Sequence, residues 1–308
     1  MTRTLVLFLA ITIAVVPGYA KTQDRPEAIV KSILDGSIEE SAPPTEQKKT
    51  VKPAAKADAK PEVKAGAKQP AVDAAQSRPA RAKKEKSEDK LQPLPPDEVL
   101  LRTGIQLYTS GLYDAALVKF REIKAKYPES QFTDKASMWI GRIHLNAGKL
   151  DEAIKEFGTV PEDRGEYPAS LYFIGDTSYR KGSTPAAIEH LVKLSAQFPE
   201  HELADDAYLL LGTIYLNEGK GGQALESATK IAKYYSKRET IDDAYFLMGQ
   251  VFEKDPGLRD LESARRIYQI FLKKAREDKE PNFQNSPLLM RVEKDLRAIE
   301  STYFKMEN

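Results

Sequence analysis

The residue types that most often carry chemistry are sparse in this chain of 308 residues. It has no cysteine, and none of its three histidines, His144, His190 and His201, has a partner at a metal-ligand spacing such as i, i+4. Disulfides and cysteine-based metal sites are therefore excluded. We expect each histidine to be a solvated or partly buried helix residue. With no catalytic constellation in view, the sequence predicts no enzymatic activity, no cofactor and no metal.

Two other patterns resemble parts of known sites. The segment 181–184, Lys-Gly-Ser-Thr, looks like the end of a phosphate-binding loop but lacks the preceding glycine spacing. It also falls where a turn between two helices is expected. The acidic pairs 205–206 and 242–243 suit the positive end of a helix. Neither pattern indicates catalysis, so binding is the function left to consider.

The charge of the whole chain conceals two unlike parts. Lys and Arg total 47 and Asp and Glu total 46, so no charge excess favours nucleic acid. Residues 47–90 contain 13 basic and 6 acidic residues, whereas residues 96–308 contain 30 basic and 34 acidic residues. A basic segment therefore precedes a mildly acidic one.

The first 20 residues resemble a secretory signal. Arg3 precedes an apolar run over residues 5–16, Pro17 ends the run, and Gly18 and Ala20 supply small residues for a cleavage site. The run is shorter than the roughly 20 residues that span a bilayer. We therefore expect export to the periplasm with cleavage, although an uncleaved inner-membrane anchor remains the alternative. No cysteine follows the run, so a lipoprotein is not expected.

Residues 21–95 are predicted to be a disordered linker rich in alanine, lysine and proline. Its central part has no aromatic residue and cannot bury enough apolar surface to order itself. It serves either as a solvated spacer or as a weak electrostatic contact with anionic envelope polymers. A short helix over residues 27–40 would place five apolar residues on one stripe. That helix either folds on a partner, folds back onto its own domain, or is only a few apolar residues in a disordered region.

An internal repeat decides the fold of residues 96–308. Five glycines are spaced by 37, 34, 37 and 37 residues, and in four units an alanine follows 12 residues later. A bulky residue stands four positions after the alanine, except in the fourth unit, which has Ala228 there. The recurring glycines are Gly104, Gly141, Gly175, Gly212 and Gly249.

Each unit is predicted to be two helices joined by a turn. The small residues allow the two helices to approach, so Gly104 and Ala116 are expected to face each other. The bulky residue, such as Phe120, is expected to fill the space toward the next helix. Because a single hairpin cannot bury both of its faces, the units must stack into a solenoid.

This pattern resembles the tetratricopeptide repeat (TPR). The resemblance implies an all-α, right-handed solenoid of about five helix pairs, over approximately 97–133, 134–167, 168–204, 205–241 and 242–280. A loop over 281–287 and a C-terminal capping helix over 287–304 follow. The turn sequences and Asp-x-Ala starts are similar to those of exported bacterial members. Two of these are the periplasmic coordinator of the Tol–Pal system and the lipoprotein of the β-barrel assembly machine.

The resemblance also implies where partners would bind. In TPR proteins the first helix of each unit lines a concave groove. Aromatic side chains among polar ones suit a peptide, because apolar anchors give affinity and polar groups fix the register. We therefore expect a non-enzymatic scaffold for envelope proteins, in outer-membrane assembly or cell-wall and division coordination. The alternative is an accessory protein that binds a small ligand or polysaccharide, with Trp139 on a first helix. The predicted groove residues are Tyr108, Met138, Arg142, Asn146, Tyr172, Asp176, Tyr179, Arg180, Leu209, Asn217 and Phe246.

Overall fold

The computed structural model describes residues 25–44 and 94–304, and the regular structure in those two ranges is helical throughout. Ten of the helices form five consecutive hairpins, each with a first and a second helix. The predicted signal peptide and most of the predicted linker lie outside the described residues. The hairpins are α2(Pro96–Thr109)/α3(Tyr113–Lys126), α4(Thr133–Asn146)/α5(Leu150–Phe157), α6(Tyr167–Arg180)/α7(Thr184–Gln197), α8(Ala204–Asn217)/α9(Gly221–Tyr234) and α10(Ile241–Lys254)/α11(Leu261–Arg276).

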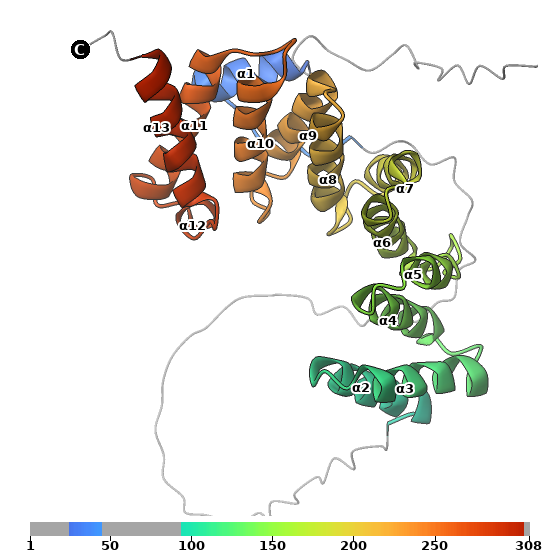
Figure 1. The fold of residues 1–308 in the computed structure, drawn as a ribbon. Helices are drawn as coiled ribbons and strands as arrows, with labels where there is room; N and C mark the ends of the chain where they lie inside the picture. The colour runs from blue at the N-terminus through green and yellow to red at the C-terminus, as the bar shows by residue number, and fades with distance from the viewer. Residues whose placement is uncertain (1–24, 45–93, 305–308) are drawn as a thin grey trace, which may run out of the picture.

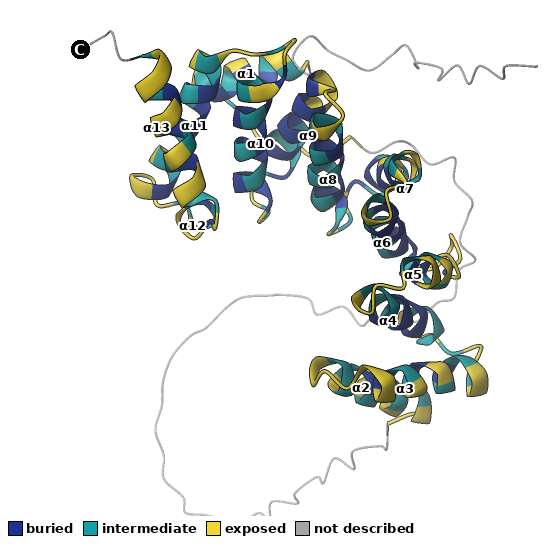
Figure 2. Ribbon diagram, in the orientation of Figure 1, coloured by how far each residue is buried: buried dark blue, intermediate teal, exposed yellow. Residues whose placement is uncertain are grey.

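The hairpins stack in chain order into a curved solenoid (Figure 1). Each second helix packs on the first helix of the next unit as well as on its own partner. The first helices lie toward the inside of the arc and the second helices toward the outside (Figure 1). The core runs between them as a buried layer along the stack (Figure 2).

Glycine makes the turn inside each of the first four hairpins. Gly111, Gly148, Gly182 and Gly219 all have positive φ angles, between 69° and 86°. A side chain is strained in this left-handed region, which explains why the same residue recurs at this place in the repeat. The segment 181–184 is therefore a helix–helix turn, as its position in the repeat predicts.

The five spaced glycines inside the first helices allow a bulky side chain to lie against the backbone. A Cβ atom added to Gly104 would lie 2.5 Å from the ring of Phe120, and one added to Gly141 would lie 2.4 Å from Phe157. The ring of Phe120, from the second helix of the same hairpin, therefore lies directly against Gly104. In units three and four the carbonyls of the equivalent alanines, Ala187 and Ala224, lie 3.4 Å from a Cβ added to Gly175 and Gly212, so both small residues lie at the helix crossing as expected.

The fourth unit departs from the repeat in a way that the next unit compensates. Its second helix has Ala228 at the bulky position, and Leu247 of α10 covers Gly212 instead. A Cβ atom added to Gly212 would lie 2.5 Å from the Leu247 side chain. Leu247 is 4% exposed. The space that a bulky residue fills in the other units is thus filled from the neighbouring hairpin.

Aspartates near the start of the first helices connect neighbouring units. Ser130 donates to Asp97 at 2.6 Å, and Thr240 donates to the buried Asp205 at 2.8 Å. Arg238 also lies 3.4 Å from Asp205. The aspartates were expected to stabilise helix N-termini, and their side chains additionally hold the loop that leads into the next unit.

The fifth unit replaces the glycine turn by an insertion that contains Asp255. This buried carboxylate accepts from the backbone N–H groups of Gly221, Gly257 and Leu258, at 2.9, 3.0 and 3.0 Å. Asp255 therefore satisfies the open N-terminus of α9 while it closes its own loop. The insertion interrupts the repeat pattern in the sequence, and in the structure it provides a contact between units four and five.

Beyond the fifth hairpin, α12(Pro281–Gln284) stands where the sequence predicts only a loop. Its Phe283 is fully buried and packs edge-on against Phe271 and Tyr245. The last helix, α13(Leu289–Tyr303), buries Val292, Leu296 and Ile299 against α11, while Tyr303 stays 55% exposed. The C-terminal end of the solenoid is thereby covered.

The N-terminal helix α1(Pro26–Leu34) folds back onto the other end of the sequence. It lies across the outside of α9 and α11 (Figure 1). Of the three alternatives for residues 27–40, the structure shows packing on the chain's own solenoid, with the helix ending at residue 34. Gly36, with a φ of 69°, ends it, and residues 37–44 continue without regular structure.

Candidate functional site

The residues predicted to line the groove are distributed over all five first helices. They do not form one cluster but follow the inner face of the solenoid from unit to unit. They lie in α2 (Tyr108), α4 (Met138, Arg142, Asn146), α6 (Tyr172, Asp176, Tyr179, Arg180), α8 (Leu209, Asn217) and α10 (Phe246).

Two tyrosine–asparagine pairs connect neighbouring first helices. The side-chain amide of Asn146 donates to the Tyr108 hydroxyl, and that of Asn217 donates to the Tyr179 hydroxyl, both at 2.9 Å. Both pairs are separated by 38 residues and join units one to two and three to four. These four residues therefore set the spacing of the inner face as well as forming part of its surface.

Arg142 is held by aromatic rings rather than by carboxylates. Its guanidinium carbon lies 4.5 Å from the centre of the Phe173 ring and 5.0 Å from that of Trp139. Its Nε atom is buried and has no hydrogen-bond partner among the described residues. Such stacking fixes the cation between units two and three without neutralising it.

Tyr172 and its neighbours make the centre of the inner face both aromatic and polar. Burial, together with the nearby carboxylates of Asp206 and Asp176, raises the pKa of Tyr172 to about 12. Asp176 is paired with Arg180 at 2.9 Å, one turn further along α6. The phenol therefore stays protonated at neutral pH and presents a hydrogen-bond donor beside an ion pair.

An acidic row extends this centre toward the C-terminal units. Burial raises the pKa of Asp243 to about 6, and Asp242 and Asp206 add to the shift. Burial and Asp205 also raise the pKa of Asp206, against the opposing effect of Arg238. Asp176, Asp206 and Asp243 thus place half-buried negative charge along three successive units.

Asp206 and Asp243 were not among the predicted groove residues. The sequence nevertheless contained a signal, because the two lie at the same position of consecutive units, 37 residues apart. We had assigned both acidic pairs to helix N-termini. The structure shows that only one member of each pair, Asp205 or Asp242, is fully buried, while its neighbour is partly exposed.

The apolar members of the predicted set differ in how much surface they offer. Met138 is only 5% exposed and packs in the core with Phe157 and Leu171, so it presents almost nothing to a partner. Leu209 and Phe246 are partly buried against the core of units four and five. Apolar contact on the inner face therefore comes from α6, α8 and α10 rather than from α4.

A cleft on units four and five continues the inner face. It passes from α8 to α10, beneath the insertion of the fifth unit. Asn217 of the predicted set lines it, and Lys254, which occupies the equivalent position of the next first helix, lines it from α10 together with Gln250. The cleft is lined by Thr213, Leu216, Asn217, Gly219, Leu247, Gln250, Lys254, Asp255 and Pro256.

The histidines lie apart from these residues. Burial lowers the pKa of each, and all three are partly buried. His144 and His190 lie in helices, whereas His201 lies in the loop before α8 and accepts from the Leu203 N–H at 3.1 Å. Over residues 25–44 and 94–304, no three metal-type side chains come together. In the same ranges no helix has the length and apolarity to cross a bilayer.

The geometry identifies the class of protein as a helical-repeat solenoid whose inner face carries aromatic and charged side chains. The tetratricopeptide-repeat family model matches residues 98–130, which are α2, α3 and the loop after them. Residues 98–130 therefore match a TPR unit, and the described residues form an all-α solenoid whose hairpins resemble TPR units. A TPR fold implies a scaffold for protein–protein interactions. No curated protein sequence matches the chain.

Several solved structures are similar to the chain at low sequence identity. A tetratricopeptide-repeat protein from Parabacteroides merdae has 18% identity and a TM-score of 0.51, over 67% of this chain and 73% of its own. PilF of Pseudomonas aeruginosa has 16% identity and a TM-score of 0.48, over 68% and 93%. MamA has 21% identity and a TM-score of 0.46, over 58% and 93%. The first of these supports the fold, and none of them identifies a partner.

Proposed function

We propose that the chain is a non-enzymatic periplasmic scaffold that binds envelope proteins through the inner face of its solenoid. The export signal in residues 1–20 and the basic segment that follows support an envelope location. Aromatic side chains placed among fixed charges suit an extended peptide segment of a partner. Outer-membrane assembly and cell-wall or division coordination are the two roles that we favour.

One observation carries the choice of partner chemistry. The carboxylates of Asp206 and Asp243 are half-buried, and Asp206 lies near Tyr172. Burial raises the pKa of both carboxyl groups, and the charge of Asp206 adds to the shift of Asp243. A lysine or arginine side chain placed between them would offset the cost of ionising them and would gain a charge-assisted hydrogen bond. We therefore propose that the bound segment carries a cationic residue next to an apolar or aromatic one.

The first test compares binding of defined peptides to the full chain and to a double variant, Asp206→Asn with Asp243→Asn. A lysine-containing apolar peptide is expected to bind the native chain at least tenfold more tightly than the double variant. A matched control, Asp151→Asn with Asp163→Asn, changes two exposed carboxylates away from the inner face. Equal affinity for native chain and double variant would remove the acidic row from the site.

A second test addresses the partners and the location. Crosslinked capture from intact envelopes, compared between the native chain and Tyr172→Ala with Arg180→Glu, identifies proteins that need the inner face. β-barrel assembly components would assign the first role, and Tol–Pal or wall-synthesis proteins the second. Capture that is unchanged in the variant would contradict the proposed face. Recovery of the mature chain in the cytoplasmic fraction alone would contradict the location.

The alternative, binding of a saccharide or small ligand, finds less support at its best candidate residue. The Trp139 ring is already stacked on Phe120, with centres 6.0 Å apart and planes 7° apart. Tyr108 also packs on it at 4.8 Å, and Arg142 lies over it. Saturable calorimetric binding of an envelope saccharide, lost in Trp139→Ala, would reverse this preference.

A further inference from the structure

The docking of α1 on the outside of the solenoid reveals a second surface, separate from the inner face. Ile29, Val30 and Ile33 are 5%, 5% and 3% exposed, so the apolar stripe of this short helix is almost completely covered. The covering residues belong to α9 and α11, the second helices of units four and five. We call residues 25–44 the strap and the surface below it the outer groove, which is formed by α9, α11 and Leu225, Phe252 and Leu258.

The outer groove holds the strap by polar contacts at the C-terminal end of α1 and in the segment that follows it. Arg266 donates to the Leu34 carbonyl at 3.0 Å, where the open carbonyls of a helix C-terminus need partners. Further along, the Ser41 N–H donates to the Lys233 carbonyl at 3.1 Å, and Lys237 pairs with Glu40 at 2.8 Å. The helix is thus recognised by its apolar stripe, its C-terminus and one acidic residue that follows it.

The charges of the two surfaces are complementary. The strap carries four acidic side chains, at positions 27, 35, 39 and 40, and two basic ones, Arg25 and Lys31, so it is acidic on balance. Lys233, Lys237 and Arg266 border the outer groove. This basic border is unlike the acidic row of the inner face. The outer groove therefore selects acidic amphipathic helices, and the inner face selects cationic segments.

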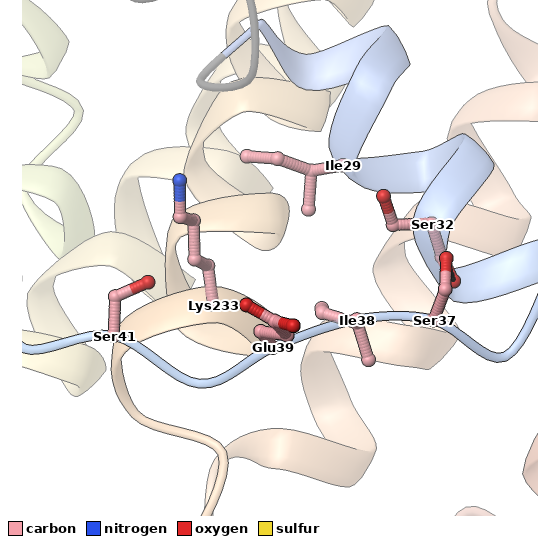
Figure 3. Close-up of a pocket in the computed structure, with 7 residues that line it drawn as sticks. All are labelled: Ile29, Ser32, Ser37, Ile38, Glu39, Ser41 and Lys233. Carbon is pink, nitrogen blue, oxygen red and sulfur yellow. Dashed lines mark hydrogen bonds between the residues drawn. The ribbon is translucent and has the colours of Figure 1, made fainter.

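The strap does not fill the outer groove. A crevice beside it is lined by Ile29, Ser32, Ser37, Ile38, Glu39, Ser41 and Lys233 (Figure 3). A second, more apolar crevice lies on its other side, between Val30 and Leu34 of the helix and Leu225 and Phe252 of the solenoid. Both crevices leave room beside the strap within the outer groove.

The solenoid is continuous without the strap. The hairpins from α2 to α11, with α13, contact one another in chain order, and α1 packs mainly on α9 and α11. A helix of nine residues is marginal by itself, so it forms where its stripe is covered. Residues 45–93 then separate it in sequence from α2.

We propose that the outer groove is a binding site for an acidic amphipathic helix, and that the strap is its dissociable, intramolecular occupant. The recognised pattern is an apolar stripe at i, i+1, i+4 and i+5, with an acidic residue beyond the helix end. A partner helix with the same pattern competes with the strap for this site. The site is independent of the inner face.

The experiment uses a fluorescent peptide of residues 25–44 and two forms of the full chain. In the variant Ile29→Glu with Ile33→Glu the strap is expected to leave the outer groove. The peptide should bind this variant saturably and should bind the native chain at least tenfold more weakly, because there the site is occupied. The control peptide carries the same two substitutions and should bind neither form. Asp206→Asn with Asp243→Asn, added to the open variant, should leave peptide affinity unchanged.

Two results would overturn the proposal: no binding of the peptide to the open variant, or equal binding to both forms. Should the open variant fail to fold, hydrogen exchange on the native chain decides instead. Amides of α1 that exchange at least tenfold faster than those of α9 and α11 support a dissociable occupant. Amides of α1 with the same protection as α9 would make the strap an integral part of the fold.

Discussion

At the scale of single residues, the repeat is built on close contact between a glycine and a bulky side chain. In four of the five units the glycine of the first helix faces Phe120, Phe157, Leu191 or Tyr268 of the second helix. The sequence spacing located both members of each pair, but their direct contact was visible only in three dimensions. The helical period predicts which residues share one face of a helix. It does not determine which side chain of the neighbouring helix will cover them.

The prediction for this contact is that Gly141→Ala destabilises the chain. An alanine gains about 1 kcal/mol over glycine inside a helix, but overpacking a core costs about 1–3 kcal/mol. The new Cβ would lie 2.4 Å from the fully buried Phe157 ring, so overpacking should win. Urea unfolding measures the change in the free energy of unfolding. The control is Gly165→Ala, because a Cβ added there meets no neighbouring heavy atom within 4 Å. An unchanged midpoint in Gly141→Ala would contradict the contact.

A second prediction concerns the pH dependence that Asp243 introduces. Burial raises the pKa of its carboxyl group to about 6, above the ordinary aspartate value of 3.8, so between these pH values the native state keeps the proton that the unfolded state has lost. Stability is therefore lost as the pH rises from 4 to 6, and the carboxylate is a cost at neutral pH.

Asp243→Asn removes that cost. It should raise the free energy of unfolding at pH 7.5 by about 1–3 kcal/mol and should change it little at pH 4. Urea unfolding at the two pH values checks this, with the exposed loop variant Asp163→Asn as the control. An equal effect of Asp243→Asn at both pH values would contradict burial as the cause.

At the scale of helices and loops, the sequence predicted the hairpins well because each carries its own signals. The internal glycine, the turn glycine and the apolar spacing recur in every one of the first four units. The strap and α12 carry no such recurrence. Their positions depend on tertiary partners: Ile33 on the outer groove, and Phe283 on Phe271 and Tyr245. Single-sequence reasoning therefore left three alternatives for the strap and predicted a loop at α12.

The candidate site was also predictable from the sequence only in part. The repeat assigned Tyr172, Asp176 and Asn217 to first helices, where the structure has them, and their role in a groove stays a prediction. It could not show that Met138 is buried in the core, nor that Tyr179 is bonded to Asn217. Whether a side chain is free or already engaged depends on the angle between neighbouring units, which no residue spacing encodes.

The insertion of the fifth unit leads to a prediction at this scale. Asp255→Ala should destabilise the chain by about 1–2 kcal/mol, the usual cost of losing a helix-capping side chain. It removes acceptors from three backbone N–H groups, one of which is at the start of α9. Thermal unfolding measures the effect. The exposed Asp278→Ala should leave the midpoint unchanged, and an equal response of the two variants would contradict the capping role.

At the scale of the whole molecule, the chain doubles back on itself. Residues 25–44 lie on units four and five, whereas α2 begins the solenoid at the opposite end (Figure 1). Because the chain contains no cysteine, an introduced pair reports this arrangement without background.

A short bismaleimide should crosslink Lys31→Cys with Leu258→Cys, since both positions border the same crevice. It should not crosslink Lys31→Cys with Lys119→Cys on α3. Gel mobility after denaturation distinguishes the internally linked chain from the open one. The opposite pattern would place α1 elsewhere on the solenoid.

The docked strap also determines the orientation of the solenoid when the chain is attached through its N-terminal segment. Helix α1, which begins at residue 26, lies beside α9 and α11 and not beside α2. A surface, bead or membrane joined to the chain at residue 25 would therefore have units four and five as its nearest neighbours while the strap is docked. Release of the strap would remove this preference, so the docking of one short helix would set the orientation of an attached scaffold.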